Sequence, residues 1–376
     1  MSDSTVKAKT TSPLLPNGRV ERYEAIVIGA GQAGLAAGYH LAQRDIDFTI
    51  VTDEVRVGDN WRKRWDSLRL FTPAKYSGLP GMPFPASSYH FADKDEVGDY
   101  LERYAERFEL AVRMGTRAMA LRREGDRFML LVDAGAVRLE AASIIVATGA
   151  FQQPRIPALA RELAPEIHQL HSSEYRNPFT LPGGPVLVVG AGNSGAQIAL
   201  ELARYRKVWL AGRDTGHMPR RVLGRDLFDW IWPFMNRART DTRLGRMVRA
   251  RSKTGGDPLL GIPERTLREA GVVRVGRVTG VKGGLPSCDG QVIAPNAIVW
   301  CTGFGPDYSW IDLPVTGADG YPRHERGEST DVPGLYFMGL RFQHRMNSSL
   351  IGGVDADAAW VAERVAQRVF AEPVPA

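Results

Sequence analysis

Two glycine-rich turns have the residue types and the spacing that bind a negatively charged group. The first reads G-A-G-Q-A-G at residues 29–34, and the second reads G-A-G-N-S-G at residues 190–195. Such a turn brings the backbone close to a pyrophosphate, whose charge then meets the free amides and positive dipole of a helix N-terminus. We therefore predict two dinucleotide sites, and their candidate contacts are Gly29, Gly31, Gln32, Ala33 and Gly34 in the first turn and Gly190, Gly192, Asn193, Ser194 and Gly195 in the second.

Each turn is flanked by the elements that must position it. Apolar residues at 25–28 precede the first turn, a helical pattern follows to about residue 41, and an apolar run returns at 48–51. Around the second turn the corresponding segments are 186–189, a helix to about residue 205, and 208–211. The order strand, glycine turn, helix, strand is the context that a dinucleotide motif requires. The sequence thus predicts an α/β fold with two dinucleotide-binding, Rossmann-like domains.

Later strand patterns place these two domains along the chain. A strand pattern at 144–147 ends in A-T-G, a second at 297–303 contains C-T-G, and a last strand at 335–338 precedes a helix at about 355–370. The threonines of the two T-G steps, Thr148 and Thr302, are candidate nucleotide contacts or hinge residues. We predict a disordered tail at 1–20, a first domain formed by 21–178 and 306–376, and a second domain at 179–305 that is inserted into the first.

The end of the second strand in each unit indicates which dinucleotide is preferred. An acid there binds the ribose hydroxyls, whereas an arginine accepts a 2′-phosphate. In the second unit this region reads A-G-R, with Arg213 and no acid before Asp214. Arg213 therefore favours NADPH over NADH, and the alternative is that it is one more surface arginine in a basic region.

Composition argues against several other classes of protein. The 376 residues carry a formal net charge of +6 and a pI near 9.4, but no nucleic-acid-binding motif accompanies the charge. We expect a solvated basic surface that also favours acidic ligands such as dinucleotides, and no nucleic-acid partner. The two cysteines, Cys288 and Cys301, belong to no C-x-x-C pair, so we expect no disulfide framework, no zinc or other metal site and no dithiol relay.

The start of the chain and its hydropathy indicate a location. Residues 1–20 contain no apolar segment of the kind found in signal peptides, and no run of about 18 apolar residues occurs in the sequence. We therefore predict a cytoplasmic protein without membrane contact.

An ordered set of motifs resembles the flavin-containing monooxygenases, the class B group that includes the plant indole-3-pyruvate monooxygenases. The resemblance extends from about residue 23 to residue 366. Besides the two glycine turns, it rests on G-D-N-W at 58–61, W-D-S-L-R-L-F-T-P at 65–73, A-T-G-A-F-Q-Q-P-R-I-P at 147–157, H-S-S-E-Y at 171–175 and C-T-G-F at 301–304. Found together in this order, the motifs are highly specific to this family.

The resemblance implies two cofactors and a reaction. FAD is expected in the first domain and NADPH in the second. NADPH would reduce FAD, and dioxygen would then form a flavin hydroperoxide that inserts one oxygen atom into a small organic substrate and releases the other as water. Because the cofactor supplies this chemistry, no catalytic side chain is assigned. Trp61 and Arg69 resemble family residues that line the flavin or its ribityl chain, and their alternatives are a core tryptophan and a surface arginine.

Two positions near the expected flavin depart from the family pattern. Where the family has a ribose-binding acid after the second strand, this chain has Thr52 followed by Asp53 and Glu54, and we choose Asp53 for the role. Phe71 stands where many animal-type members carry an asparagine near the flavin. Support for the reactive flavin by a side chain must therefore come from elsewhere.

The family fingerprint between the two domains is half present. His171 and Tyr175 fit its histidine and tyrosine, while Pro165 and Ile167 stand at its aromatic and glycine positions. We interpret His171 as a structural hinge residue rather than a catalytic base, because oxygenation by a flavin requires no histidine.

Two other functions stay open beside oxygen insertion. The first is an NADPH oxidase or reductase that passes electrons from FAD to an acceptor, and it is favoured by Phe71 and by the incomplete fingerprint before His171. The second is a redox-sensing protein that uses the FAD and NADPH pair as a switch to regulate a partner. For the enzyme, the expected partners are a small-molecule substrate and dioxygen. The sequence leaves the oligomeric state open, including a homo-oligomer.

A basic segment with an aromatic cluster follows Arg213. Residues 213–253 contain eleven Arg or Lys residues against four Asp, with aromatic and apolar residues concentrated at 227–235. A helix of this kind can lie on a membrane surface, or it can act as a lid or simply pack on the protein. We favour the lid or packing, because the cluster is short and Pro233 interrupts it.

Overall fold

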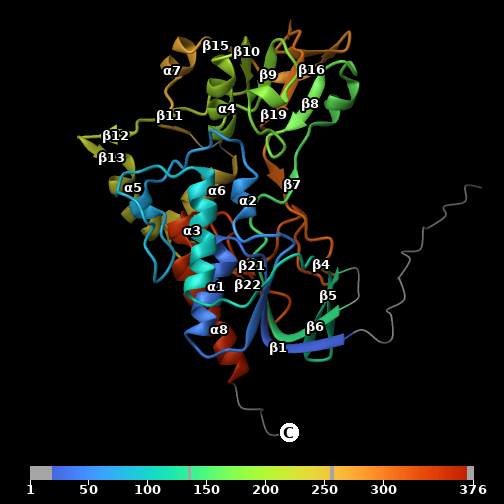
Figure 1. Cartoon of the computed structure of the whole chain (residues 1–376), viewed down its shortest axis with the longest axis vertical. Coiled ribbons are helices and arrows are strands. Elements are labelled where there is room, and N and C mark those ends of the chain that lie inside the picture. The colour runs from blue at the N-terminus through green and yellow to red at the C-terminus, as the bar shows by residue number, and fades with distance from the viewer. Residues whose placement is uncertain (1–18, 134–136, 255–257, 371–376) are drawn as a thin grey trace, which may run out of the picture.

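The computed structural model describes residues 19–133, 137–254 and 258–370. Its two main sheets lie toward opposite ends of the long axis of the molecule (Figure 1). The predicted disordered tail falls largely on residues 1–18, which lie outside the described residues. Arg19 and Val20, which that prediction also included, instead begin the first strand, because they pair with Val137 and Arg138.

The first sheet takes strands from both the beginning and the end of the described chain. The strand order is β21-β22-β23-β6-β1-β2-β3, and β5 pairs with both β6 and β4. The pairs that β1 forms with β2 and β6 are parallel, as is the pair of β6 with β23. The strands are β1 (Arg19–Ile28), β2 (Phe48–Val51), β3 (Val112–Arg113), β4 (Ala118–Glu124), β5 (Arg127–Val132), β6 (Val137–Val146), β21 (His324–Glu325), β22 (Glu328–Ser329) and β23 (Leu335–Phe337).

Both faces of the first sheet are covered. Ala25 and Val27 of β1 belong to a core shared with the helices α1 (Gln32–Ala42), α3 (Lys94–Arg107) and α8 (Asp355–Val369). Ile26 and Ile28 belong to the core on the opposite face. Successive residues of a strand point to opposite faces, so a strand covered on both sides is apolar at every position. This explains the unbroken apolar run that precedes the first glycine turn.

The second sheet repeats this arrangement with parallel strands only. Its order is β15-β10-β9-β19-β8. Val186 and Val188 of β9 share a core with α4 (Asn193–Ala203) and α7 (Glu264–Glu269), while Leu187 and Val189 share a core with the antiparallel strands β16 and β17. The two sheets confirm the predicted α/β fold with two Rossmann-like units. The strands of this part are β8 (His168–His171), β9 (Val186–Val189), β10 (Val208–Ala211), β15 (Val272–Val275), β16 (Val278–Lys282), β17 (Leu285–Cys288), β18 (Gln291–Val292) and β19 (Ala297–Trp300).

The strand β8 lies outside the bounds that the sequence predicts for the second domain. The predicted boundary at residue 178 assigns His168–His171 to the first domain, but β8 pairs in parallel with β19 of the second sheet. The segment around β8 is rich in proline, and a strand of four residues shows no periodic pattern there. We therefore propose that the second domain begins before β8, and the other domain bounds stay predictions.

The chain passes between the two sheets in two neighbouring segments. The strand β7 (Gln153–Pro154) leaves the first sheet, and β20 (Phe304–Gly305) returns from the second. These strands pair with each other in antiparallel orientation, and Figure 1 shows β7 between the two sheets. The pair of short strands forms the hinge between the domains.

The basic aromatic segment extends from the second sheet onto the first domain. Asp229 accepts hydrogen bonds from Lys75 Nζ at 2.8 Å, Tyr76 OH at 2.7 Å and Tyr89 OH at 2.8 Å. The inner side of the segment is therefore packed, as one of the predicted alternatives states. No helix within the described ranges is long and apolar enough to cross a membrane. The elements of this segment are β11 (His217–Met218), β12 (Arg221–Val222), β13 (Arg225–Asp226), α5 (Leu227–Arg237), α6 (Arg243–Thr254) and β14 (Leu259–Leu260).

Candidate functional site

The first glycine turn has a backbone that only glycine accepts. Gly29 follows β1 with a φ of +109°, and a Cβ there would lie 2.6 Å from the carbonyl oxygen of Ala147. A Cβ on Gly34 would lie 1.8 Å from the carbonyl oxygen of Gly29. These distances are far shorter than van der Waals contacts, so both glycines are needed for the turn to close against β6 and α1.

The second turn repeats the first in the other domain. Gly190 has a φ of +108°, and a Cβ there would lie 2.2 Å from the carbonyl oxygen of Cys301. A Cβ on Gly195 would lie 1.9 Å from the carbonyl oxygen of Gly190. Cys301 thus occupies the place beside the second turn that Ala147 occupies beside the first.

Both turns present a helix N-terminus without a cap. Gly31 precedes α1 and Gly192 precedes α4, and neither helix has a side-chain cap or an acidic residue in its first turn. A Cβ on Gly192 would meet nothing within 4 Å, whereas one on Gly31 would lie 3.3 Å from Asn60 Nδ2. The first amides of both helices are therefore left to bind an anion from outside the chain.

The predicted contact residues at the start of α1 and α4 differ in burial and in their contacts. Ala33 is buried, Gln32 is half-buried and Ser194 is exposed. Asn193 holds the β14 segment, because its Oδ1 accepts a hydrogen bond from Leu260 N at 2.9 Å and its Nδ2 donates to Pro258 O at 3.3 Å. The side chain of Asn193 is therefore engaged within the protein, and its role as a nucleotide contact stays a prediction.

The two acids after β2 lie in different environments. The side chain of Asp53 is exposed, while that of Glu54 is half-buried, and Glu54 Oε2 has no hydrogen-bond partner in the described part of the chain. Burial raises the pKa of Glu54 to about 7, with smaller opposing effects from Lys63 and from the backbone amide of Asn60. A carboxylate oxygen that is buried without a hydrogen bond is costly, so Oε2 is suited to a ligand that donates one.

Asn60 joins this acid to the first glycine turn. It lies on the short helix α2 (Asp59–Arg62), its backbone amide faces Glu54, and its Nδ2 adjoins the Cβ position of Gly31. Asn60 Oδ1 is also buried and lacks a partner among the described residues. The structure therefore brings Gly31, Glu54 and Asn60 together. The sequence offered one signal for Asn60, the G-D-N-W motif that contains it, but no role was assigned to it.

Trp61 and Arg69, the other residues predicted near the first cofactor, lie at the boundary between the domains. Trp61 packs against the cores of both domains. The side chain of Arg69 is 56% exposed, and its Nη1 lies 3.2 Å from Asp93 Oδ2 and 3.6 Å from Glu96 Oε2. Trp61 thus bridges the domains, and Arg69 is partly neutralised by two acids.

The two T-G threonines both contact the hinge. Thr148 Oγ1 accepts a hydrogen bond from Gln152 Nε2 at 2.8 Å, and the hydroxyl of Thr302 donates to the carbonyl oxygen of Arg155. The backbone amide of Arg155 in turn donates to Gly303 O at 2.9 Å. The sequence offers two roles for these threonines, nucleotide contact and hinge residue, and the side-chain contacts agree with the hinge role.

His171 is also a hinge residue. Its Nε2 lies 3.0 Å from the carbonyl oxygen of Gly303, and Ser173 N donates to its Nδ1 at 3.2 Å. A carbonyl can only accept, so Nε2 carries the proton and the ring is neutral. Burial lowers the pKa of His171, in agreement with this tautomer. The contact with Gly303 connects β8 to the segment just before β20 and agrees with the structural interpretation.

Arg213 lies exposed just beyond β10. It follows Gly212, whose φ is +144° and whose Cβ position lies 2.9 Å from Ala191 N in the second glycine turn. Arg213 makes no ion pair with any residue in the described ranges. A free guanidinium next to a turn that is suited to pyrophosphate can receive a further phosphate.

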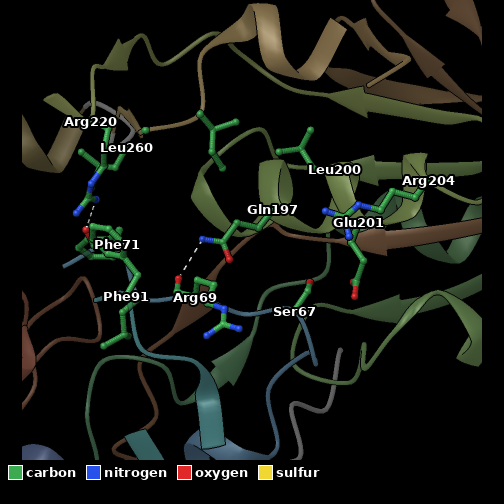
Figure 2. A pocket seen from close by; sticks show the side chains of 13 residues that line it. Ser67, Arg69, Phe71, Phe91, Gln197, Leu200, Glu201, Arg204, Arg220 and Leu260 are labelled. Atoms are coloured by element: carbon green, nitrogen blue, oxygen red, sulfur yellow. Dashed lines mark hydrogen bonds between the residues drawn. The ribbon is translucent and has the colours of Figure 1, made fainter. Parts of the chain in front are cut away.

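A pocket of about 350 Å³ lies where the two domains meet (Figure 2). One wall comes from the first domain, with Arg69, Phe71 and Phe91, and the other comes from Gln197 and Glu201 on α4 of the second domain. Arg220 of the basic aromatic segment closes one end in Figure 2. Across the described residues, no group of three His, Cys, Asp or Glu side chains could hold a metal ion.

Comparisons with known proteins agree with this geometry. Residues 26–250 match the family model described as pyridine nucleotide-disulphide oxidoreductase. An uncharacterized CzcO-like oxidoreductase of Geobacillus kaustophilus is 42% identical over 90% of this chain and 97% of its own length. A flavin-containing monooxygenase of Stenotrophomonas maltophilia has a structure that superimposes with a TM-score of 0.75 at 27% identity, over 92% of this chain and 98% of that one. The indole-3-pyruvate monooxygenase YUCCA1 of Oryza sativa is 34% identical over 54% of this chain and 51% of its own length.

Proposed function

Because the chain belongs to the pyridine nucleotide-disulphide oxidoreductase family and is an oxidoreductase related to flavin-containing monooxygenases, we propose that it is an NADPH-dependent FAD monooxygenase. One oxygen atom of dioxygen would enter a small organic substrate, and the other would leave as water. The observation that carries this proposal is the pair of equivalent glycine turns, each opening an uncapped helix in its own parallel sheet. The cytoplasmic location stays a prediction.

FAD fits the first turn, and NADPH fits the second. Asn60 adjoins Gly31, and its backbone amide contacts Glu54. Each of these two residues has a buried oxygen without a partner in the described part of the chain, and the hydroxyls of a ribose can donate to such oxygens. At the second turn, Arg213 can receive the 2′-phosphate that distinguishes NADPH from NADH. When bound, FAD supplies the redox chemistry by accepting electrons from NADPH and passing them to dioxygen.

The chain's own part is to bind and orient these cofactors and to limit access of water. Trp61 packs on both cores, and the hydrogen bond from Thr302 to Arg155 connects the two crossings, so the two turns are held in a defined relation. No side chain is assigned a proton transfer.

If FAD and NADPH bind as proposed, the isolated protein should be yellow and should release FAD rather than FMN on denaturation. It should also lose its flavin absorbance when NADPH is added without oxygen. Flavin that NADPH leaves oxidised would contradict the proposal.

We propose that Glu54, rather than Asp53, binds the ribose of FAD. Glu54→Gln should weaken FAD binding by about 1.5 to 3 kcal/mol, the usual range for a hydrogen bond to a charged group. In the unsubstituted apoprotein, FAD affinity should rise as the pH increases through about 7, because Glu54 then loses the proton that competes with the ribose hydroxyls. Titration of apoprotein with FAD at several pH values measures both effects.

The neighbouring acid provides the matched control. Asp53→Asn should leave FAD affinity at high pH unchanged, because the side chain of Asp53 is exposed. It should only move the rise in affinity to somewhat lower pH, because the charge of Asp53 helps to raise the pKa of Glu54. In Glu54→Gln the rise near pH 7 should disappear. If Asp53→Asn lost FAD and Glu54→Gln kept it, the role would return to Asp53.

Arg213 should determine the preference for NADPH. Arg213→Ala should weaken NADPH binding by about 1.5 to 3 kcal/mol, because charge-assisted hydrogen bonds to the 2′-phosphate are lost, and should leave NADH binding almost unchanged. Michaelis constants for the two nucleotides measure this difference. Arg225→Ala, at an exposed arginine of β13, is the control and should change neither. An equal loss for both nucleotides in Arg213→Ala would exclude the proposed contact.

One observation favours the oxidase or reductase as a second candidate. The Phe71 ring is stacked with the Phe228 ring, and the two ring centres lie 6.1 Å apart. The backbone carbonyl oxygen of Phe71 accepts a hydrogen bond from Arg220 Nη1 at 2.6 Å. Phe71 thus contributes an apolar ring where related enzymes supply an amide. In the oxidase, NADPH and dioxygen would give NADP⁺ and hydrogen peroxide without an oxygenated product. A redox-sensing protein would instead consume NADPH very slowly with every substrate.

A further inference from the structure

The helix α5 has two faces of different character. Side chains that are three, four or seven positions apart lie on the same side of a helix. Phe228 and Met235 are buried on the side that packs against the protein. On the opposite side, Trp230 is 46% exposed, Phe234 is 41% exposed, and Arg237 is exposed as well. The helix thus presents aromatic rings and a positive charge to solvent.

The hairpin formed by β12 and β13 extends this exposed side. Trp230 Nε1 donates a hydrogen bond to Val222 O at 3.1 Å, and the guanidinium carbon of Arg225 lies 5.7 Å from the centre of the Trp230 ring. Leu223 and Gly224 form the tip, and the Leu223 side chain is 86% exposed. The hairpin projects at one side of the molecule (Figure 1). The outer face of the segment therefore consists of Leu223, Arg225, Trp230, Phe234 and Arg237.

The backbone at the tip of the hairpin is unfavourable for leucine. The φ angles of Leu223 and Gly224 are +49° and +76°, as a type I′ turn requires at its two central residues. Asn, Asp or Gly accepts the first of these positions readily, whereas the Cβ of a bulky residue is crowded there. Because Leu223 is so exposed, packing within the chain does not offset this cost. A strained and exposed apolar residue is suited to a contact outside the chain.

The positive charge of the outer face is not neutralised by the protein. Residues 221–237 contain two acids, Asp226 and Asp229, and both are turned inward. Asp226 pairs with Arg220 at 2.8 Å, and Asp229 pairs with Lys75 at 2.8 Å. The two arginines of the outer face form no ion pair with any residue that the structure describes. The outer face is therefore both apolar and cationic.

We propose that the outer face binds the surface of a lipid bilayer that contains anionic lipids. Leu223 and Trp230 enter the headgroup region, and the two arginines contact lipid phosphates. A second copy of the chain fits this face poorly, because the arginines of the two molecules would repel each other. The inference goes beyond the proposed function. It also departs from the sequence-based expectation of no membrane contact, because the separation of the two faces depends on the fold.

Vesicle flotation tests the proposal. The FAD-loaded full chain would be mixed with vesicles of phosphatidylcholine alone, or of phosphatidylcholine with about 30 mol% phosphatidylglycerol. We expect binding to the anionic vesicles to be at least about tenfold tighter, since each arginine near the surface contributes to the attraction. This preference should decline as added salt screens the charges.

Leu223→Asn removes the apolar tip and retains the turn. Asn accepts a positive φ, and Asn-Gly is a favoured pair for a type I′ turn, so the melting temperature should stay the same or rise. The affinity for anionic vesicles should fall by about tenfold or more, because the inserted apolar side chain is lost. Loss of binding in this variant thus has a cause other than misfolding. Unchanged vesicle binding in Leu223→Asn would overturn the proposal.

A pair of double variants tests the charge. Arg225→Gln combined with Arg237→Gln should reduce the preference for anionic vesicles to about twofold or less. The control combines Arg117→Gln with Arg277→Gln, two exposed arginines that directly precede β4 and β16, and it should keep the preference. In Figure 1, β4 and β16 lie on the other side of the view from β12 and β13.

Three further results would contradict bilayer binding. The first is equal binding to the two kinds of vesicle, and the second is an equal loss of the preference in both double variants. The third is a dimer in solution that Leu223→Asn dissociates, without binding to either kind of vesicle, which would assign the outer face to a second copy of the chain.

Discussion

Gly192→Leu should abolish measurable NADPH binding while the protein keeps its FAD and its thermal stability. A Cβ at residue 192 would meet nothing within 4 Å, so the protein itself has room for the larger side chain. Its φ of −81° is also accessible to leucine. The added atoms instead occupy the approach of a pyrophosphate to the N-terminus of α4. We expect the dissociation constant for NADPH to rise by more than about 100-fold, equivalent to about 2.7 kcal/mol.

The measurements are a titration with NADPH, the bound FAD content and the melting temperature. Gly192→Ala, with one added carbon, should show a smaller loss and provides the graded control. Ordinary NADPH binding in Gly192→Leu, with the fold intact, would show that the nucleotide does not approach α4 through this turn.

Gly31→Leu should give a folded protein that does not retain FAD. The substitution occupies the corresponding approach at α1, next to Asn60. A Cβ at residue 31 would lie 3.3 Å from Asn60 Nδ2, so the Asn60 side chain must shift by a few tenths of an ångström. We expect the FAD content to fall below about a tenth of that of the unsubstituted protein, because the flavin pyrophosphate can no longer reach the helix amides.

The two variants form a reciprocal test of which turn holds which cofactor. Gly31→Leu should still bind NADP⁺, because the second turn is unchanged, and Gly192→Leu should still be yellow. Absorbance at the flavin maximum and calorimetry with NADP⁺ give the two readings for each variant. A loss of FAD in Gly192→Leu, with FAD retained in Gly31→Leu, would reverse the assignment of the domains.

The framework of the fold could be predicted because it depends on local pattern. The apolar runs before Gly29 and Gly190 are unbroken, since their strands are covered on both faces, and each turn needs glycine where a Cβ would strike a carbonyl. The four-residue strand β8 could not be predicted, because only its pairing with β19 makes it a strand. Periodicity carries no information about such pairing.

The side chains around the cofactor sites were less predictable. Asn60 contacts Glu54, six residues earlier in sequence, and adjoins Gly31, and this proximity to Gly31 depends on how α2 folds back toward α1. Arg220 reaches Phe71 and Phe91 across roughly 130 to 150 positions of chain, through a segment that composition described only as basic and aromatic. Burial decides which acid or arginine lacks a partner, and burial is a property of the folded chain.

The fate of the two oxygen atoms of dioxygen distinguishes a monooxygenase from an oxidase. The FAD-loaded protein would be mixed with NADPH and ¹⁸O-labelled dioxygen in the presence of candidate amines, sulfides, ketones and aromatic acids, and the NADPH consumed, the hydrogen peroxide formed and the label in the product would be measured together. The account predicts that with an accepted substrate each NADPH yields one product molecule carrying one ¹⁸O atom, and little hydrogen peroxide. One hydrogen peroxide for every NADPH with every candidate, and no labelled product, would contradict oxygen insertion and leave the oxidase.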